Sequence, residues 1–474
     1  MQETIPLDEL VREYFTDVCI DKRLSRQVAG TDRAVPDFVS DWLVSRYTTD
    51  GLPDEAKINA FLARHLPERK QKNTLLNELR VGGSLKILDA YSVRVDLKRS
   101  RLVLEIPCLD IRDASVRDDI VDLNPLLLVG NVWGSGTIVQ RPKDDKPEEN
   151  EVCMVDFAPM QTSIVQLDYY IEVRKQFTLD QWRELLVRSM GYNPDSYTLD
   201  EQSHLLTRLT PLVQPRVNLI ELAPKGTGKS YVFSRLSRHA WLISGGVVTR
   251  AQMFYNMQSK TAGVITRYDA VVLDEVQTIR FAEEGELIGA FKGYLEQGEF
   301  RVMGYRGTAD AGLVLLANIP ITSAGRPRDS ELFKTLPSWL QGISATALLD
   351  RFHGLVPGWE LQKIRTDSLC QGMALKADYL GEVMHALRAR GEYRQWAKDH
   401  IESEGSIRDI HAVERLSAAY LKLLFPSLET VTPELFEVHC LRPAKALRRR
   451  IREQLAIADD EYTSALARID LRTN

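Results

Sequence analysis

A glycine-rich turn follows a short apolar run and ends in Lys-Ser. Residues Ala223–Ser230 read Ala-Pro-Lys-Gly-Thr-Gly-Lys-Ser, and they come directly after the run Val217–Leu222. A strand that breaks into such a turn before a helix predicts a phosphate-binding P-loop in an α/β sheet. Gly226 and Gly228 allow backbone conformations that a Cβ would forbid, so successive N–H groups can point at phosphate oxygens. The helix predicted to begin near Lys229 adds the positive end of its dipole.

The side chains of this loop predict ATP bound together with Mg²⁺. Lys229 is expected to reach the β- and γ-phosphates and the Ser230 hydroxyl to bind Mg²⁺, and Thr227 belongs to the same nucleotide-binding run, Gly226-Thr-Gly-Lys-Ser. The P-loop pattern asks for glycine where this chain has Ala223. Alanine is the smallest replacement, so we expect a tighter turn that still forms the loop. The alternative is a glycine-rich turn that binds nothing.

The composition predicts a protein of several domains in the cytoplasm. A chain of 474 residues is too long for one core, and about 150 residues per domain gives about three domains. We find neither an apolar stretch long enough to span a membrane nor a signal peptide at the N-terminus. The five cysteines are scattered without C-x-x-C spacing, which argues against a disulfide framework and a zinc site. The net charge of −5 means that any contact with nucleic acid must come from local patches.

Changes in hydrophobic period divide the chain into five predicted segments. Apolar residues three and four apart predict a helical domain over residues 1–80, and period-two alternation predicts a β-rich, OB-like barrel over 81–175. A helical connector is expected over 176–212, a nucleotide-binding core of alternating strands and helices over 213–365, and a C-terminal helical lid over 366–474. The alternative for the β-rich segment is a small domain used only for packing or oligomerisation.

Two carboxylates end the next long apolar run. Asp274 and Glu275 follow Ala270–Leu273, and a buried parallel strand delivers its carboxyl end to the phosphates. Asp274 is expected to hold Mg²⁺ and Glu275 to polarise the attacking water, which favours a hydrolase over a kinase. The alternative is a strand that ends at an exposed turn.

Two further residues fit the catalytic set of an AAA+ ATPase. Asn318 ends the strand Leu313–Ala317, where an amide could bind the γ-phosphate or the lytic water as sensor 1; alternatively it only starts a turn. Arg351 lies in Leu348–Phe352, which resembles the arginine-finger segment of the replicative MCM helicases. This resemblance implies that Arg351 enters a neighbouring subunit's site, where it stabilises charge on the transferred phosphoryl group. A salt bridge within one subunit is the alternative.

A basic, aromatic hairpin is predicted before the sensor strand. The segment Glu299–Gly307 carries Arg301, Tyr305 and Arg306, and in helicase-like AAA+ rings such an insertion faces the central pore. These side chains could contact a phosphate backbone or a base. The alternative is a solvent-exposed hairpin with incidental arginines.

Other basic residues gather near the C-terminus. Lys445, Arg448 or Arg449, and Arg452 share one face of a predicted helix, which we expect to be solvated, with DNA or a partner subunit as the alternative ligand. The sensor-2 arginine, a nucleotide-binding residue, is expected on a helix of this region, and Arg408 and Arg415 are the candidates.

The whole chain resembles the BrxL family, the Lon-like AAA+ ATPases of BREX bacteriophage-defence systems. The resemblance is carried by the following segments: Leu7-Asp8-x-Leu10, Asn124-Pro-Leu-Leu, Trp133-Gly-Ser-Gly-Thr, Gly226-Thr-Gly-Lys-Ser, Asp274-Glu275, Arg408-Asp-Ile-His-Ala-Val and Leu421-Lys-Leu-Leu-Phe-Pro426. Many members continue into a Lon-type protease domain with a serine and lysine dyad. This sequence contains no Pro-Ser-Ala-Gly-like nucleophile motif, so we do not expect protease activity.

The resemblance implies an α/β AAA+ P-loop ATPase core with a helical lid, preceded by an N-terminal helical part and a small OB-like barrel. It implies a homo-oligomer, a hexameric ring that is single or stacked as a double ring, which acts on double-stranded DNA alongside other phage-defence proteins. A DNA motor or clamp is the favoured function. A polypeptide-remodelling ATPase, with Trp241 or Tyr255 in an aromatic pore loop, and a nucleotide-dependent scaffold are the alternatives.

Overall fold

The computed structural model of the protein describes residues 5–24, 35–49, 52–143, 148–160, 165–258, 260–341 and 343–472. The chain forms two compact units, one made of Met1–Cys19, Val165–Leu375 and Leu380–Asn474, the other of Ile20–Ile164 with Lys376–Tyr379. The five segments predicted from the sequence are a finer division, and their boundaries stay a prediction.

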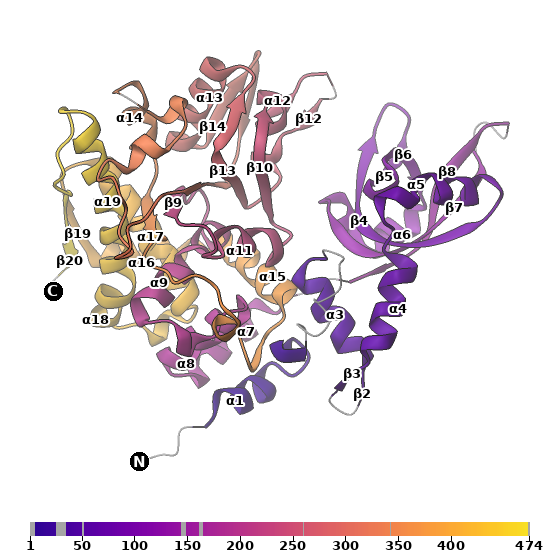
Figure 1. Ribbon diagram of the computed structural model, residues 1–474, viewed down its shortest axis with the longest axis horizontal. Helices are drawn as coiled ribbons and strands as arrows, with labels where there is room; N and C mark the ends of the chain where they lie inside the picture. The colour runs from indigo at the N-terminus through magenta and orange to yellow at the C-terminus, as the bar shows by residue number, and fades with distance from the viewer. Residues whose placement is uncertain are drawn as a thin grey trace. The chain divides into compact units, whose positions relative to one another are not determined.

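The smaller unit contains a closed barrel of five strands in the order β4-β5-β6-β8-β7 (Figure 1). The strands are β4 (Ser84–Asp96), β5 (Arg101–Ile106), β6 (Ile111–Val116), β7 (Val132–Pro142) and β8 (Asn150–Pro159). The long strand β4 closes the barrel because residues 84–91 pair with β7 and residues 92–96 pair with β5. The prediction of a small barrel in this region is confirmed.

Helices accompany the barrel, and its interior is apolar. The helices are α3 (Asp37–Tyr47), α4 (Glu55–His65), α5 (Lys72–Arg80) and α6 (Asp118–Leu123). Tyr91 and Phe157 meet inside the barrel edge to face, with ring centroids 5.6 Å apart. The buried Tyr91 hydroxyl donates a hydrogen bond to the Ile87 carbonyl, so no polar group of this side chain is left unsatisfied.

The larger unit is built on a parallel sheet of five strands in the order β10-β13-β16-β9-β17. The strands are β9 (Leu219–Ala223), β10 (Ala240–Val248), β13 (Ala270–Phe281), β16 (Gly312–Asn318) and β17 (Gly354–Pro357). Strands β9, β16 and β17 are buried almost throughout, which explains why they read as unbroken apolar runs. Because β16 lies between β9 and β13, the ends of these three strands meet at one edge.

Helices of the larger unit begin at clear capping signals. Thr178 and Thr198 each form a capping box with the residue three positions on, Gln181 and Glu201, at the starts of α8 and α9. The helices are α1 (Leu7–Tyr14), α7 (Leu167–Val173), α8 (Leu179–Ser189), α9 (Leu199–Thr207), α10 (Thr210–Val213), α11 (Lys229–Arg235), α12 (Arg250–Met253), α13 (Glu284–Gln297), α14 (Ile343–Leu349), α15 (Ala377–Arg388), α16 (Glu392–His400), α17 (Ile407–Leu424), α18 (Pro433–Phe436) and α19 (Arg442–Ala458).

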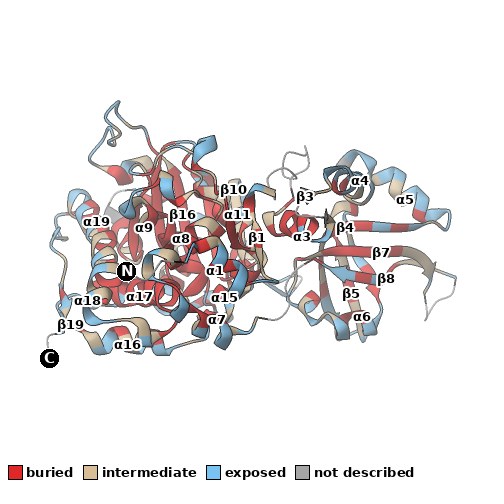
Figure 2. Cartoon of the chain, turned by 90° about the horizontal axis from the view of Figure 1, so that it is seen from below, coloured by how far each residue is buried: buried red, intermediate tan, exposed pale blue. Residues whose placement is uncertain are grey.

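The C-terminal part of the chain is mostly helical, as predicted, and contains one strand pair. Helix α17 is buried at every residue from 412 to 424 and is largely red in Figure 2. Strands β19 (Ile401–Glu404) and β20 (Arg468–Leu471) pair antiparallel. Helix α15 ends at Arg388, and after a short non-helical segment the chain continues as α16 from Glu392. Whether these helices act as a nucleotide lid stays a prediction.

The larger unit also contains two antiparallel hairpins. Strands β11 (Tyr255–Asn256) and β12 (Thr261–Ala262) form one, and β14 (Glu299–Val302) and β15 (Tyr305–Thr308) form the hairpin predicted before the sensor strand. The five cysteines are all free thiols. Within the described ranges, every helix is too short or too polar to cross a bilayer.

Candidate functional site

The glycine-rich loop lies between β9 and α11, and α11 begins at Lys229 as predicted. Gly226 and Gly228 have φ angles of 90° and 72°, the left-handed region that favours glycine. A Cβ on Gly228 would lie 2.4 Å from Ile364 Cδ1 and 2.8 Å from the Tyr192 hydroxyl. The backbone therefore approaches its neighbours too closely for any side chain. Thr227 is buried in this turn.

The three sequence motifs converge at the edge where β9, β16 and β13 end. Lys229 Nζ donates a hydrogen bond of 2.6 Å to Asn318 Oδ1, and Asn318 pairs in register with Ala223. Lys229 and Asp274 are each only 7% exposed. Burial lowers the pKa of Lys229, although the carboxylates of Glu221 and Asp274 oppose this shift. Lysine, amide and carboxylate thus share one small polar site, as triphosphate binding requires.

Glu275 is turned out of its strand by an unusual backbone conformation. Its φ angle is +48°, its N–H donates to Asp274 Oδ1 at 2.8 Å, and its carbonyl accepts from the Thr278 hydroxyl at 2.9 Å. A left-handed conformation costs a non-glycine residue about 1–2 kcal/mol. Glu275 is exposed while Asp274 is buried, so the two carboxylates occupy different environments at the same strand end. Such strain often accompanies a functional residue.

A buried ion pair lies beneath the loop and was missed by the sequence analysis. Arg208 and Glu221 are each 1% exposed, and the guanidinium contacts both carboxylate oxygens at 2.6 and 3.1 Å. Arg208 also donates to the Thr227 carbonyl at 3.2 Å and to the Tyr192 hydroxyl at 3.3 Å. Burial alone would lower the pKa of Arg208, but Glu221, Tyr192 and Tyr197 together outweigh burial, and the pKa is raised. The sequence did contain a signal for this pair. Glu221 lies inside an otherwise apolar strand, and a buried carboxylate requires a partner of opposite charge.

The segment Gly358–Ile364, which we call the strap, lies against both ends of the loop. A Cβ on Gly358 would lie 2.5 Å from Ala223 Cβ, and Ile364 N–H donates to the Gly226 carbonyl at 2.9 Å. Lys363 side-chain carbons lie about 4 Å from the position that a Gly226 Cβ would take. The strap therefore explains how Ala223 is tolerated, because the space for its methyl group is left by Gly358.

Arg351 lies at the end of α14 and forms an ion pair within its own chain. Its Nε is 2.7 Å from Glu296 Oε2, its NH1 donates to the Ala347 carbonyl, and its side chain is 15% exposed. Arg408, a sensor-2 candidate on α17, contacts the same Glu296 at 3.1 Å and Asp350 at 3.0 Å. The within-chain salt bridge that the sequence left open is thus present, and the role of Arg351 in a neighbouring site stays a prediction.

Arg415, the other sensor-2 candidate, is buried. Its NH1 donates to the Arg216 carbonyl at 3.0 Å and lies 3.2 Å from His353 Nε2. Burial lowers the pKa of Arg415 to about 9, and the nearby Arg216 adds to the shift. These contacts hold Arg415 in the protein interior, and its assignment to nucleotide binding stays a prediction.

The basic face predicted on α19 is not a solvated one. Arg448 is buried and forms ion pairs with Asp350 at 2.5 Å and Asp409 at 2.7 Å, and Lys445 pairs with Asp470 at 3.0 Å. The prediction is wrong for these two residues because helical spacing shows which residues share a face but not which acidic groups that face meets.

The β14–β15 hairpin carries the three residues predicted to contact DNA. Arg301 and Arg306 are exposed. The rings of Tyr305 and Tyr255 stack, with centroids 3.7 Å apart and an angle of 7° between their planes. All four line an open groove of about 1100 Å³ beside α13. Trp241 lies in strand β10, and its ring centroid is 5.0 Å from that of Tyr268. Because Trp241 belongs to a strand of the central sheet and not to a loop, its assignment to a pore loop is wrong.

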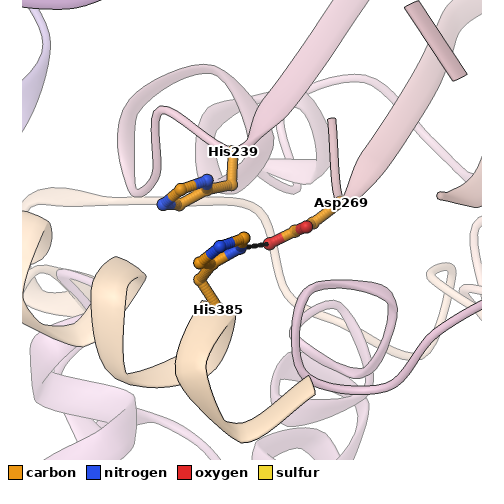
Figure 3. Close-up of side chains that lie close together, drawn as sticks. All are labelled: His239, Asp269 and His385. Atoms are coloured by element: carbon orange, nitrogen blue, oxygen red, sulfur yellow. Dashed lines mark hydrogen bonds and ion pairs between the residues drawn. The ribbon is translucent and has the colours of Figure 1, made fainter. Parts of the chain in front are cut away.

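A second cluster of ionisable groups, shown in Figure 3, joins α15 to the starts of β10 and β13. The rings of His239 and His385 stack 4.0 Å apart and 3° from parallel, and His385 Nδ1 lies 2.7 Å from Asp269. The ligand atoms of these residues lie within 4.8 Å of one another. However, parallel rings direct their nitrogen lone pairs side by side, whereas a metal needs them to converge. Arg388 and Glu382 complete a hydrogen-bonded ion network instead.

Two family models match the chain. One, described as "Lon-like protease BrxL-like, ATPase domain", matches residues 152–467, and the other, described as "BREX system Lon protease-like protein BrxL N-terminal", matches residues 13–139.

Individual proteins match as well. The chain is 30% identical over 464 residues to a protein named Lon-like protease BrxL from Escherichia coli O9:H4 (strain HS), which covers 96% of this chain. It is 28% identical over 452 residues, 93% of this chain, to a protein of the same name from Bacillus cereus (strain H3081.97). The chain spans 65% of the length of each of these relatives. A shorter match, 26% over 183 residues, covers 36% of this chain and 42% of Uncharacterized protein 440 from Sulfolobus islandicus rod-shaped virus 1.

We expect the free energy of unfolding to fall when the pH is lowered from 7.5 to 5.5. Burial lowers the pKa of His239 and of His353, where Arg415 and Arg448 add to the effect. Both histidines stay neutral in the folded protein but gain protons when it unfolds, so their stabilisation is present above pH ~6.5 and is lost below it. Each can contribute up to about 1.4 kcal/mol per pH unit. Urea unfolding of the wild type and of His353→Gln, which should show a shallower pH dependence, tests this.

We expect Gly358→Ala to destabilise the larger unit by about 1–3 kcal/mol, because its methyl group would collide with Ala223. Ala223→Gly removes the colliding atom, so the double variant should recover part of the loss. The contacts that remain are with Glu221 Oε1 at 2.8 Å and the Leu222 carbonyl at 3.1 Å. Thermal unfolding of the wild type, both single variants and the double variant measures the coupling. Additive effects of the two substitutions would contradict this account of Ala223.

Proposed function

The chain belongs to the BrxL family, and we propose that it is a ring-forming AAA+ ATPase that acts on double-stranded DNA in bacteriophage defence. In this proposal ATP binding and hydrolysis drive clamping of DNA or movement along it. The observation that carries the proposal is the 2.6 Å contact between Lys229 and Asn318 beside Asp274 and Glu275. It supports a single site with a phosphate-binding lysine, a sensor amide and two carboxylates of different exposure.

The residues present fit ATP with Mg²⁺. Gly226 and Gly228 have positive φ angles, which suits a loop whose backbone N–H groups cradle phosphate, and Lys229 is held at the strand edge where phosphates would lie. Ser230 and Asp274 would hold Mg²⁺, which when bound neutralises phosphate charge. Glu275, exposed and turned from its strand, would accept a proton from the attacking water.

Arg351 supports a site that a second copy of the chain completes. The side chain extends from the end of α14 and is held by Glu296, so it must leave this partner to reach another subunit. A guanidinium in that position would stabilise charge on the transferred phosphoryl group. This is the reason to propose a ring, hexameric as the family resemblance implies, single or stacked as a double ring, acting with other phage-defence proteins.

Two surfaces support contact with DNA. The groove beside α13 presents Arg301, Arg306 and Tyr305, which offer phosphate contacts together with an aromatic ring. In the smaller unit, β6 and β8 pair parallel within the closed five-strand order, the arrangement expected of an OB-like barrel, a fold that often binds oligonucleotides.

A second candidate function is remodelling of polypeptides. The stacked pair of Tyr255 and Tyr305, next to Met303 with 69% of its surface exposed, forms an aromatic and apolar hairpin surface that could grip an unfolded chain. Stimulation of ATPase activity by unfolded protein but not by DNA would favour this candidate.

We expect Glu275→Gln to keep ATP binding but to lower the ATPase rate by about 10²–10⁴-fold, the range of a lost general base. The control is Glu284→Gln, which makes the same change at an exposed residue of α13, and its ATPase rate should equal that of the wild type. A phage-challenge assay separates a motor from a scaffold, because a motor loses protection in Glu275→Gln. Full protection by this variant would support the alternative that the protein is a nucleotide-dependent scaffold.

Activity recovered on mixing the inactive Lys229→Ala and Arg351→Ala variants would place Arg351 in a neighbouring site.

We expect the double variant Arg301→Ala/Arg306→Ala to bind duplex DNA more weakly and with a smaller salt dependence, the slope of log K against log salt falling by about 2. Basal ATPase activity should remain, because neither side chain lies at the P-loop edge. Lys334→Ala, which removes another exposed charge, is the control. Fluorescence anisotropy with a labelled duplex at several salt concentrations gives both quantities. Unchanged affinity and slope would remove the hairpin from the DNA-binding surface.

A further inference from the structure

A pocket of about 400 Å³ lies between α8, α9, α17 and α19 in the larger unit, away from the three motifs. Its basic residues come from three of these helices and from the π-turn Glu437–Leu441 before α19: Arg183, His204, His439, Arg442 and Arg450. The acidic residues of its lining are Asp200 and Glu360. Burial and the neighbouring Arg183 lower the pKa of His439, so the positive charge of the lining comes mainly from its three arginines. Three guanidinium groups against two carboxylates favour an anionic ligand.

A carboxylate of the chain itself already occupies part of this site. Glu360 Oε2 lies 3.0 Å from His204 Nε2, and its Oε1 lies 3.2 Å from the Arg450 guanidinium. The contact with His204 is the main cause of the lowered pKa of Glu360. Glu360 is 43% exposed, so solvent and small solutes can compete for its two partners. The carboxylate stands where an anionic group of a ligand would bind.

The remaining basic side chains are less fully paired. The Arg183 guanidinium is buried, lies 3.4 Å from His439 Nδ1 and pairs with Asp180 at 2.9 Å. Arg442 is exposed at the pocket and has no ion-pair partner within the part of the chain that the structure describes. Arginine favours phosphate because its planar fork matches two phosphate oxygens.

The floor of the pocket is apolar. Leu424, Leu447 and the ring of Tyr420 line it. The Tyr420 hydroxyl is hydrogen-bonded to the Thr207 hydroxyl, so it does not need a polar partner from a ligand. An apolar floor with charged walls and this volume suits a flat organic body that carries phosphate.

Glu360 connects the pocket to the P-loop because it lies in the strap. Two residues before it, Gly358 faces Ala223, and four residues after it, Ile364 donates to the Gly226 carbonyl. Both ends of the strap thus touch the nucleotide loop, while its middle is held by His204 and Arg450. Displacing Glu360 would release the middle of this segment.

We propose that the pocket binds a small phosphorylated ligand of nucleotide size, which displaces Glu360 from His204 and Arg450 and thereby alters how the P-loop holds ATP. The binding step stands by itself. The effect on ATP rests on the proposed ATPase function.

Isothermal titration of the full chain with AMP, in a Lys229→Ala background that weakens the P-loop site, tests the binding step. We expect one saturable site per chain, affinity at least tenfold lower in Arg442→Ala/Arg450→Ala, and higher affinity in Glu360→Gln, which loses the competing charge. Arg449→Ala, an exposed neighbour on α19, is the matched control and should bind as the parent does. Absence of binding, or binding unchanged by the double substitution, would overturn the proposal.

The effect on ATP is measured separately in chains that keep Lys229. Glu360→Gln should shift the KM for ATP at least threefold, whereas Arg449→Ala, an exposed residue of α19 outside the pocket lining and the strap, should leave it unchanged. An unchanged KM in Glu360→Gln would overturn the coupling. If the chain binds AMP as expected but hydrolyses no ATP, the proposed ATPase function fails and the pocket stands; if it hydrolyses ATP but binds no AMP, the reverse holds.

Discussion

The buried ion pair between Arg208 and Glu221 determines the shape of the nucleotide loop. Glu221 lies in β9, the strand that leads into the loop, and Arg208 extends from the end of α9 to the carbonyl of Thr227 within it. Removing one partner would leave a buried charge alone, which costs about 3–5 kcal/mol. Tyr192 extends this network, because its hydroxyl accepts from Arg208 and donates to the Gly228 carbonyl, so strand, loop and helix are joined by one set of hydrogen bonds.

Long-range contacts decide the parts of the site that the sequence could not predict. The P-loop, the paired carboxylates and Asn318 were predictable because each follows an apolar strand, a local signal. The partner of Ala223, Gly358, lies far along the chain and became visible only in the fold. The ion pairs of Arg448 were unpredictable for the same reason, since helical spacing carries no information about acidic groups on other elements.

The fold was predicted with similar limits. Period-two alternation predicted a β-rich segment here, and β4 and β5 pair antiparallel within it. Closure of the barrel depends on the length of β4, which pairs on both sides, and no local pattern shows that. The left-handed backbone of Glu275 is likewise a result of tertiary structure, because glutamate has no intrinsic preference for it.

The ion network around Glu296 bears on how a neighbouring site could be completed. Glu296 is contacted by Arg351 and Arg408 together, and Arg408 also contacts Asp350. If Arg351 moves to a neighbour's phosphates, Glu296 keeps Arg408 as its partner, so no carboxylate is left unpaired. The loss is then that of one partly exposed pair, about 0–1 kcal/mol, which is small beside the stabilisation that an arginine gives to a developing phosphoryl charge. Arg408 therefore has a physical role in this chain whether or not it contacts nucleotide, because it pairs with both Glu296 and Asp350.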